Sequence, residues 1–136
     1  MNQSALKCLL SFMKSMKSWE IEFCTAQDEA DEKDLDLTPI RDDYALRLKE
    51  ILDMYSLDCG LNRERLVDLG STIPVTYDPD RDEVDAESES LAVFIVKQAT
   101  GFKSQFRFSM INKDQSWLIQ KKERLGGSGK WLASSL

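Results

Sequence analysis

The sequence predicts an α+β fold, with N-terminal helices packed on one face of a curved antiparallel sheet. The first half of the chain carries apolar residues at helical spacing, and the last third contains three strand-like runs: LAVFIVKQ, SQFRFSMI and SWLIQKKE. Thr100-Gly101 and residues 112–115 separate these runs, as turns separate the strands of a β-meander. No repeat or long linker divides the 136 residues, so residues 1–136 are expected to form a single domain.

A first helix is expected from Ser4 to about Ala30. Apolar residues recur there at spacings near three and four, and lysines lie mostly on the other side. Since apolar side chains cover more than half of its circumference, this helix should lie between the sheet and a second helix. The apolar positions are Leu6, Leu9, Leu10, Met13, Met16 and Phe23, with Phe12 and Trp19 on a second strip.

A second helix is expected from Thr38 to about Leu57, because Pro39 stands at an early position and aspartates occupy the first turn. Gly60 is suited to end it. The stretch 61–69 reads either as a linker or as a short helix, and a helical turn ending near Gly70 is favoured. A short strand is expected over Ile73–Tyr77, and Pro74 makes it an edge or irregular strand.

The strands of the meander should each turn one face to the core. In the second run, apolar residues share one parity and polar residues hold the other, which is typical of a half-buried strand, and in the third run Trp117 and Ile119 alternate with Leu118 and Gln120. The apolar positions are Phe102, Phe106, Phe108 and Met110 in one run and Trp117 and Ile119 in the next. After the glycine-rich turn at 126–129, an apolar tail of Trp131, Leu132 and Leu136 is expected to dock on the body.

Charge is distributed unevenly along the chain. Residues 1–90 carry 22 acids and 10 bases, whereas residues 91–136 carry 2 acids and 8 bases, and the whole chain has a net charge of −6. Acids concentrate in two runs, 28–36 and 78–89, and a strand over 83–89 would expose its acidic side chains along one face. Nucleic acid is therefore disfavoured as a partner, and a basic protein is favoured.

Composition argues against several kinds of site. The chain has no histidine, which removes the commonest general base at neutral pH and the Ser-His and Cys-His pairs. Its three cysteines form no CxxC pair, so neither a metal nor a cofactor is expected. Asp78, Asp80 and Asp82 loosely resemble a calcium loop, but Glu83 stands where glycine is needed.

Targeting signals are not evident in the sequence. No run of about 18 apolar residues predicts a membrane span. Lys7, Lys14 and Lys17 interrupt the apolar residues near the N-terminus, so no signal-peptide core forms. A cytoplasmic location is expected.

Several motifs follow one another in a recognisable order. A first helix carrying Trp19-Glu20 is followed by a second helix, a Tyr77-Asp78-Pro79 turn and an acid-rich strand. The run from Thr100 to Phe108 and the run from Trp117 to Glu123 come next, with Trp131 near the end. This order resembles the nuclear transport factor 2-like (NTF2 fold) immunity proteins of bacterial polymorphic toxin systems. The resemblance covers most of the chain.

The resemblance implies a cone-shaped fold with a concave mouth, and a protein that binds a cognate toxin domain and blocks it. On this hypothesis the chain is not an enzyme. It protects the producing cell by occluding a toxin that is basic, for example a nuclease. The candidate toxin contacts are Asp28, Glu29, Asp31, Glu32 and Asp34 or, alternatively, Asp82, Glu83, Asp85, Glu87 and Glu89.

The alternative hypothesis is a small-ligand-binding protein or an enzyme that uses the mouth of the same cone. Its base would be a buried Asp or Glu beside Tyr44, Tyr55 or Trp117. A deep pocket holding such a carboxylate would favour this alternative, whereas a mouth plugged by apolar side chains would not.

Overall fold

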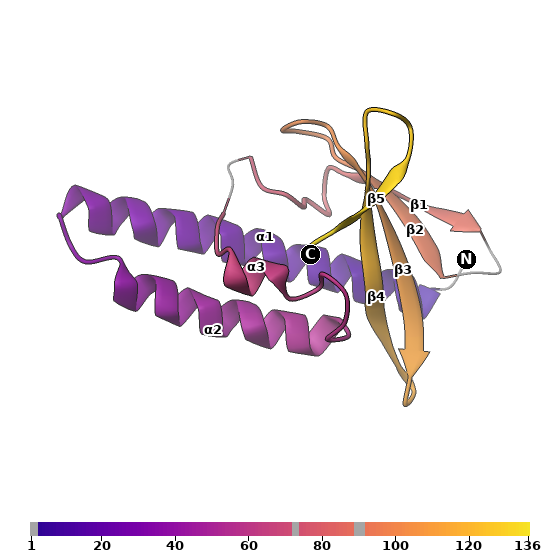
Figure 1. Cartoon of the computed structure of the whole chain (residues 1–136), viewed down its shortest axis with the longest axis horizontal. Helices are drawn as coiled ribbons and strands as arrows, with labels where there is room; N and C mark the ends of the chain where they lie inside the picture. Colours follow the sequence, from indigo (N-terminus) through magenta and orange to yellow (C-terminus); the bar gives the residue numbers. More distant parts are fainter. Residues whose placement is uncertain (1–2, 72–73, 89–91) are drawn as a thin grey trace.

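A computed structural model describes residues 3–71, 74–88 and 92–136. Two long helices form an antiparallel hairpin, a short helix follows, and five strands complete the chain (Figure 1). The elements are α1 (Gln3–Glu32), α2 (Thr38–Tyr55), α3 (Glu64–Val67), β1 (Glu83–Ser88), β2 (Val93–Lys97), β3 (Gln105–Lys113), β4 (Ser116–Leu125) and β5 (Trp131–Ser134). None of the helices in this part of the chain is long and apolar enough to cross a membrane.

The strands form one antiparallel sheet in the order β1-β2-β3-β4-β5, so each strand pairs with its neighbours in the sequence. This is the predicted meander, extended by β1 before it and by the apolar tail as β5. Leu136 is buried beyond β5, as the docking of the tail required. The α+β prediction, with helices first and a meander last, is confirmed.

Helix α1 packs against both α2 and the sheet, as its wide apolar surface predicts, but it does not separate them, because α2 also contacts β4. Leu9, Phe12 and Met16 share one buried core with Phe108 of β3 and Ile119 of β4. Burying a side chain of this size contributes about 1.5–3 kcal/mol. The far end of the α1–α2 hairpin extends beyond the sheet (Figure 1), so the turn between the two helices lies away from the core.

Two expectations about strands are wrong. Residues 74–77 form no strand, and Ile73 lies outside the described residues. Pro74 has no N–H to give to a ladder, and the N–H of Thr76 donates to the carboxylate of Glu20 instead. Phe102 is 99% exposed in the β2–β3 turn, because Gly101 and Lys103 have positive φ and break the extended alternation.

Strand β4 contains one extra residue. The register between β3 and β4 shifts by one, so Gln120 forms a β-bulge. Simple alternation from Ile119 would place Lys121 on the core side. The bulge places Lys122 there, and Lys122 is buried.

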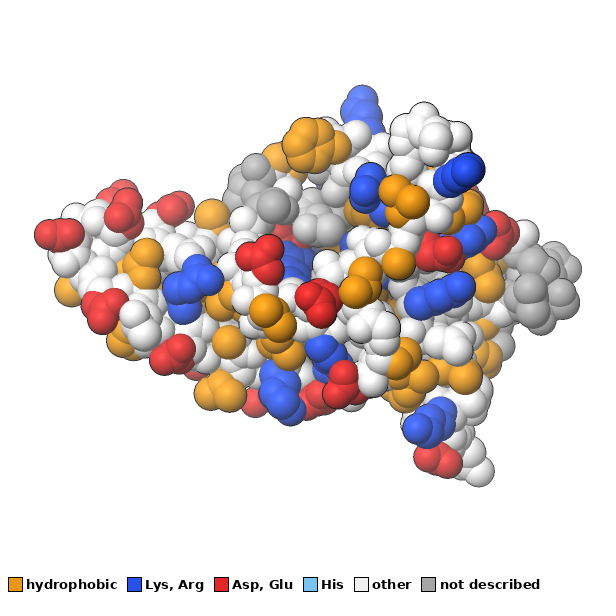
Figure 2. All heavy atoms as spheres, viewed as in Figure 1, with side chains coloured by type: hydrophobic (Ala, Val, Ile, Leu, Met, Phe, Trp, Pro, Cys, Tyr) orange, Lys and Arg blue, Asp and Glu red, His pale blue; other side chains and the backbone are white. Residues whose placement is uncertain are grey.

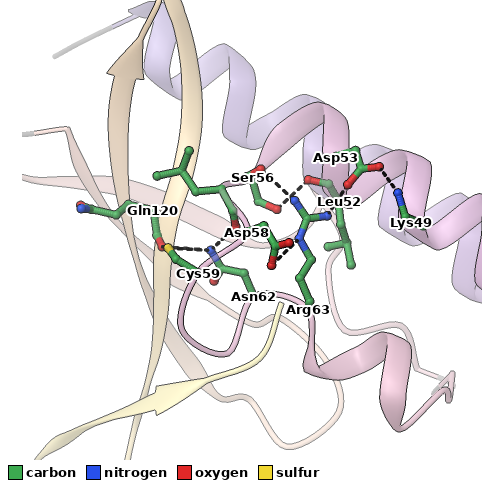
Figure 3. A network of polar contacts seen from close by, with 10 residues as sticks. Lys49, Leu52, Asp53, Ser56, Asp58, Cys59, Asn62, Arg63 and Gln120 are labelled. Atoms are coloured by element: carbon green, nitrogen blue, oxygen red, sulfur yellow. Dashed lines mark hydrogen bonds and ion pairs between the residues drawn. The ribbon is translucent and has the colours of Figure 1, made fainter.

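The loop after α2 holds this bulge (Figure 3). The side-chain amide of Asn62 donates to the carbonyl of Gln120 and to the carbonyl of Leu57, both at 2.9 Å. The Cys59 thiol donates to the same Gln120 carbonyl at 3.5 Å. Nearby, Arg63 binds Asp53 at 2.9 Å and anchors the loop to the end of α2. These contacts hold Gln120 in the bulge, and the bulge determines which of the following β4 side chains face the core.

Replacing Asn62 with alanine is expected to lower the free energy of unfolding by about 1–3 kcal/mol, because the carbonyls of Leu57 and Gln120 each lose an amide donor, and the thiol of Cys59 is a weaker donor to Gln120. Urea unfolding followed by circular dichroism measures the change. Asn112→Ala is the control, since Asn112 is exposed near the β3–β4 turn, and it should change stability by less than about 0.5 kcal/mol. Equal effects of the two variants would show that the bulge does not depend on Asn62.

Candidate functional site

The first acidic run lies at the free end of the helical hairpin. Asp28, Glu29, Asp31 and Glu32 occupy the last turns of α1, and Asp34 lies in the turn that follows. All five are exposed, and acidic side chains gather at this end in Figure 2. Within the described ranges, no ion pair engages any of these five carboxylates. The hairpin tip, defined as residues 28–36, is therefore an uncompensated negative patch.

The second run belongs to β1 and the turn before it. The Asp82 carboxylate accepts hydrogen bonds from the N–H groups of Asp78 and Ala99, both at 2.9 Å, and so holds the turn. Glu83 lies 3.9 Å from Lys97, and Glu87 lies 3.5 Å from Arg107. Much of this run is therefore engaged within the fold. Asp85 is exposed, and Glu89 falls outside the described residues.

The structure does not bring the two runs together. The α1–α2 turn and β1 lie at opposite ends of the long axis of the molecule (Figure 1). One compact partner surface can therefore face one run or the other, which keeps the two sets as alternatives.

A cavity of about 840 Å³ opens beside the inner face of the sheet. Its walls come from α3 and the segment after it, the β2–β3 turn, strands β3 and β4, and the last residues of the chain. Arg65, Lys122 and Arg124 bring three positive charges to its lining, whereas Glu64 and Asp68 are exposed on the α3 side. The mouth of the fold is thus open and is not plugged by apolar side chains.

Lys122 is the buried cation of this cavity. Its side chain is 5% exposed, and its ammonium donates to the Tyr77 hydroxyl at 2.8 Å. The ammonium also lies 4.1 Å from the ring centroid of Phe106 and 5.0 Å from that of Tyr77. Burial, together with the charges of Arg65 and Arg124, lowers the pKa of Lys122 to about 7, and the charge of Glu20 acts in the opposite direction. Burial also raises the pKa of Tyr77 above its ordinary value.

Arg65, which lines the cavity, forms an ion pair with the buried Glu20. The two side chains meet at 3.1 Å, and Glu20 is fully buried. The guanidinium of Arg65 lies over the ring of Trp19 at 5.1 Å, and the Glu20 carboxylate accepts the N–H of Thr76 at 3.2 Å. This pair connects α1, α3 and the irregular segment before β1.

The enzyme alternative required a buried carboxylate beside Tyr44, Tyr55 or Trp117. The carboxylates that are buried in the described residues belong to Glu20 and Asp78, and they bind Arg65 and Lys17. These contacts give no support to a base at the expected place.

Sequence reasoning missed the basic lining of the cavity. The signal was present: Lys122 and Arg124 are two apart, as residues on one face of a strand must be. Alternation counted from Trp117 and Ile119 put Lys122 on the outer face, because a bulge cannot be seen in the pattern of a single strand.

Comparison with known proteins decides the family. The family model described as NTF2 fold immunity protein matches residues 4–135. The chain belongs to the NTF2 fold immunity proteins. It is similar to the immunity protein RhsIA of Dickeya dadantii (strain 3937), with 28% identity over 135 residues, covering 97% of this chain and 96% of that protein. No solved structure matches it significantly.

Membership of the immunity family indicates what kind of partner these surfaces serve. An immunity protein has a cognate toxin as its partner, and the family indicates protection in place of catalysis. The hairpin tip and the cavity both carry charged side chains that no ion pair engages in the described residues. They differ in sign, so they suit different binding partners.

Proposed function

We propose that this immunity protein binds its cognate toxin domain in the cytoplasm of the producing cell and neutralises it by occlusion, without chemical turnover. The family supports the immunity role, and the uncompensated acids of the hairpin tip support the mode of binding. The partner we propose is a basic domain. A nuclease fits, because its substrate-binding surface must be positive to hold phosphates.

The hairpin tip suits a fast first encounter with a basic surface. Residues 28–36 carry six acids and one lysine, on a turn that projects from the body (Figure 1). Such a concentration of one sign steers association and raises its rate by about 10–10³. Leu35 is 58% exposed among these acids and supplies an apolar contact, which charge alone does not provide.

Reversing three tip charges should slow association with the toxin. For the variant D28K/D31K/E32K we expect an association rate about 10–100-fold lower at low salt and a weaker dependence on salt. Surface plasmon resonance against the toxin domain encoded by the neighbouring gene, catalytically inactivated, measures both. Lysine at the C-terminal end of α1 complements the helix dipole, so the variant should remain folded.

The matched control reverses the other acidic run. E83K/D85K/E87K changes the same number of charges on β1, where two of the three face a cation in the fold. A lower association rate in this control alone would indicate that the toxin contacts β1 and not the hairpin tip. Unchanged association rates in both variants would show that neither acidic run steers binding to the toxin.

The occlusion proposal itself has a direct test. Producing the toxin domain in bacteria with this protein should restore growth, and the purified complex should lack toxin activity at equimolar ratio. Growth arrest despite a folded immunity protein would contradict the proposed function. Loss of toxin activity only after long incubation, with chemical change of the toxin in mass spectra, would contradict occlusion.

A further inference from the structure

We infer that the cavity beside β4 binds an organic carboxylate attached to an apolar group, with Lys122 and Arg124 contacting the carboxylate. This inference concerns a different surface from the hairpin tip and does not depend on toxin binding.

The fold leaves the Lys122 ammonium with few partners. A lysine ammonium has three N–H donors. Within the described residues the acceptor it reaches is the Tyr77 hydroxyl, and two aromatic rings surround the rest of the charge. No carboxylate oxygen of this part of the chain, that of Leu136 included, forms an ion pair with it. A buried charge is costly unless it is paired, so an anion at this place would be strongly favoured.

Arg124 supplies the second cation on the same face. It follows Lys122 by two residues after the bulge, and both side chains line the cavity. No ion pair engages Arg124 in the segments that the structure describes, and its side chain is exposed. A guanidinium can bind both oxygens of a carboxylate at once, while the lysine binds as a point charge. The two side chains therefore form a complementary pair of donors.

The charge of the lining favours an anion. Glu20 already compensates Arg65 at 3.1 Å, which leaves Lys122 and Arg124 as the lining cations that no ion pair engages in the described residues. Glu64 and Asp68 also line the cavity, but they are exposed, so water screens their charges. A cationic ligand would thus meet like charges inside, and a neutral one would leave the buried ammonium unpaired.

The walls favour an apolar body behind the charged group. Pro74, Phe106, Leu136 and the exposed ring of Phe102 line the cavity together with side-chain hydroxyls and an amide. The volume of about 840 Å³ lies within the range of organic-ligand pockets, about 300–1,000 Å³. A phosphate would need a denser set of donors than one lysine and one arginine beside aromatic walls. A carboxylate next to an aromatic or aliphatic group fits both features.

The carboxylate can come from a small molecule or from the end of a protein chain. Four probes distinguish the sources: phenylacetate, its amide phenylacetamide, the peptide acetyl-Ala-Gly-Ala-Phe with a free carboxylate, and the same peptide amidated. Isothermal titration calorimetry and thermal shift with the whole chain measure binding. We expect both carboxylates to bind and each amide to bind at least 10-fold more weakly. The tighter of the two carboxylates indicates the source.

Variants test the residues. Lys122→Met keeps the length of the side chain and removes the charge, and Arg124→Gln removes the guanidinium. Each should weaken carboxylate binding at least 10-fold. Lys121→Met is the matched control, because this lysine lies on the other face of β4 with a side chain that is 59% exposed, and it should leave affinity unchanged.

Several results would overturn the inference. One is the absence of binding by either carboxylate at millimolar concentration to folded protein. Others are equal affinity for acid and amide, or equal loss in Lys121→Met and Lys122→Met. If Lys122→Met failed to fold, Arg124→Gln would carry the test, because its exposed side chain contributes little to the core.

Discussion

The variant Glu20→Ala is expected to lose about 3–5 kcal/mol in free energy of unfolding, the usual effect of breaking a buried ion pair from one side. Glu20 is fully buried and binds Arg65, whose side chain is 12% exposed. Without the carboxylate, the guanidinium stays in the interior without that partner. The N–H of Thr76 also loses an acceptor. Chemical unfolding followed by circular dichroism measures the loss.

The control lies two residues further along α1. Glu22 is 59% exposed and meets Arg47 at 3.8 Å, so Glu22→Ala should change stability by at most about 0.5 kcal/mol. The double variant Glu20→Ala/Arg65→Met should recover part of the loss, because it removes the charge left behind. A loss below about 1 kcal/mol in Glu20→Ala, or no recovery in the double variant, would contradict a role for this pair in holding α1, α3 and the segment before β1.

The helices and the central strands were accessible from sequence because their signals are local. Leu9, Phe12 and Met16 repeat at helical spacing whatever the partner, and Phe106 and Phe108 alternate as a strand must. The first helix was expected to end near Ala30, and α1 ends at Glu32. A local pattern cannot decide how far a solvated helix end continues.

The features that sequence could not give depend on contacts between distant segments. The bulge at Gln120 is satisfied by Asn62, which lies 58 residues away, and it decides that Lys122 enters the cavity. The segment 74–77 has the composition of a strand, but Glu20 of α1 takes one of its donors. The acidic residues could be located as runs. Which of them stand uncompensated became visible only once Lys97 and Arg107 were placed beside β1.

Replacing Lys122 with methionine should stabilise the protein at pH 6 and lose this advantage as the pH rises. The pKa of Lys122 is lowered from 10.5 to about 7 by burial and by Arg65 and Arg124, against the opposing charge of Glu20. Below pH 7 both the folded and the unfolded states carry the charge, and the folded state bears its full cost. The lowering of the Lys122 pKa from 10.5 to about 7 corresponds to about 5 kcal/mol in the free energy of unfolding.

Between pH 7 and 10.5 the unfolded chain binds the proton more tightly than the folded one, so wild-type stability rises with pH over this window. Methionine avoids the cost at every pH but leaves the Tyr77 hydroxyl without its donor, a loss of about 1–3 kcal/mol. At pH 6 the variant should therefore be about 2–4 kcal/mol more stable than the wild type, with the gain falling steadily toward pH 9.5.

The measurement is urea unfolding of both proteins at pH 6, 7.5 and 9.5, which ends below the ordinary pKa of tyrosine, 10.0. Lys121→Met should differ from the wild type by the same small amount at all three values, since its charge is already in water. A pH-independent difference for Lys122→Met would contradict the buried ammonium. Saturating phenylacetate should shrink the advantage of the variant at pH 6, because a bound carboxylate offsets the cost of the charge only where the lysine remains. The pH dependence of unfolding and the effect of phenylacetate would then both depend on the charge of Lys122.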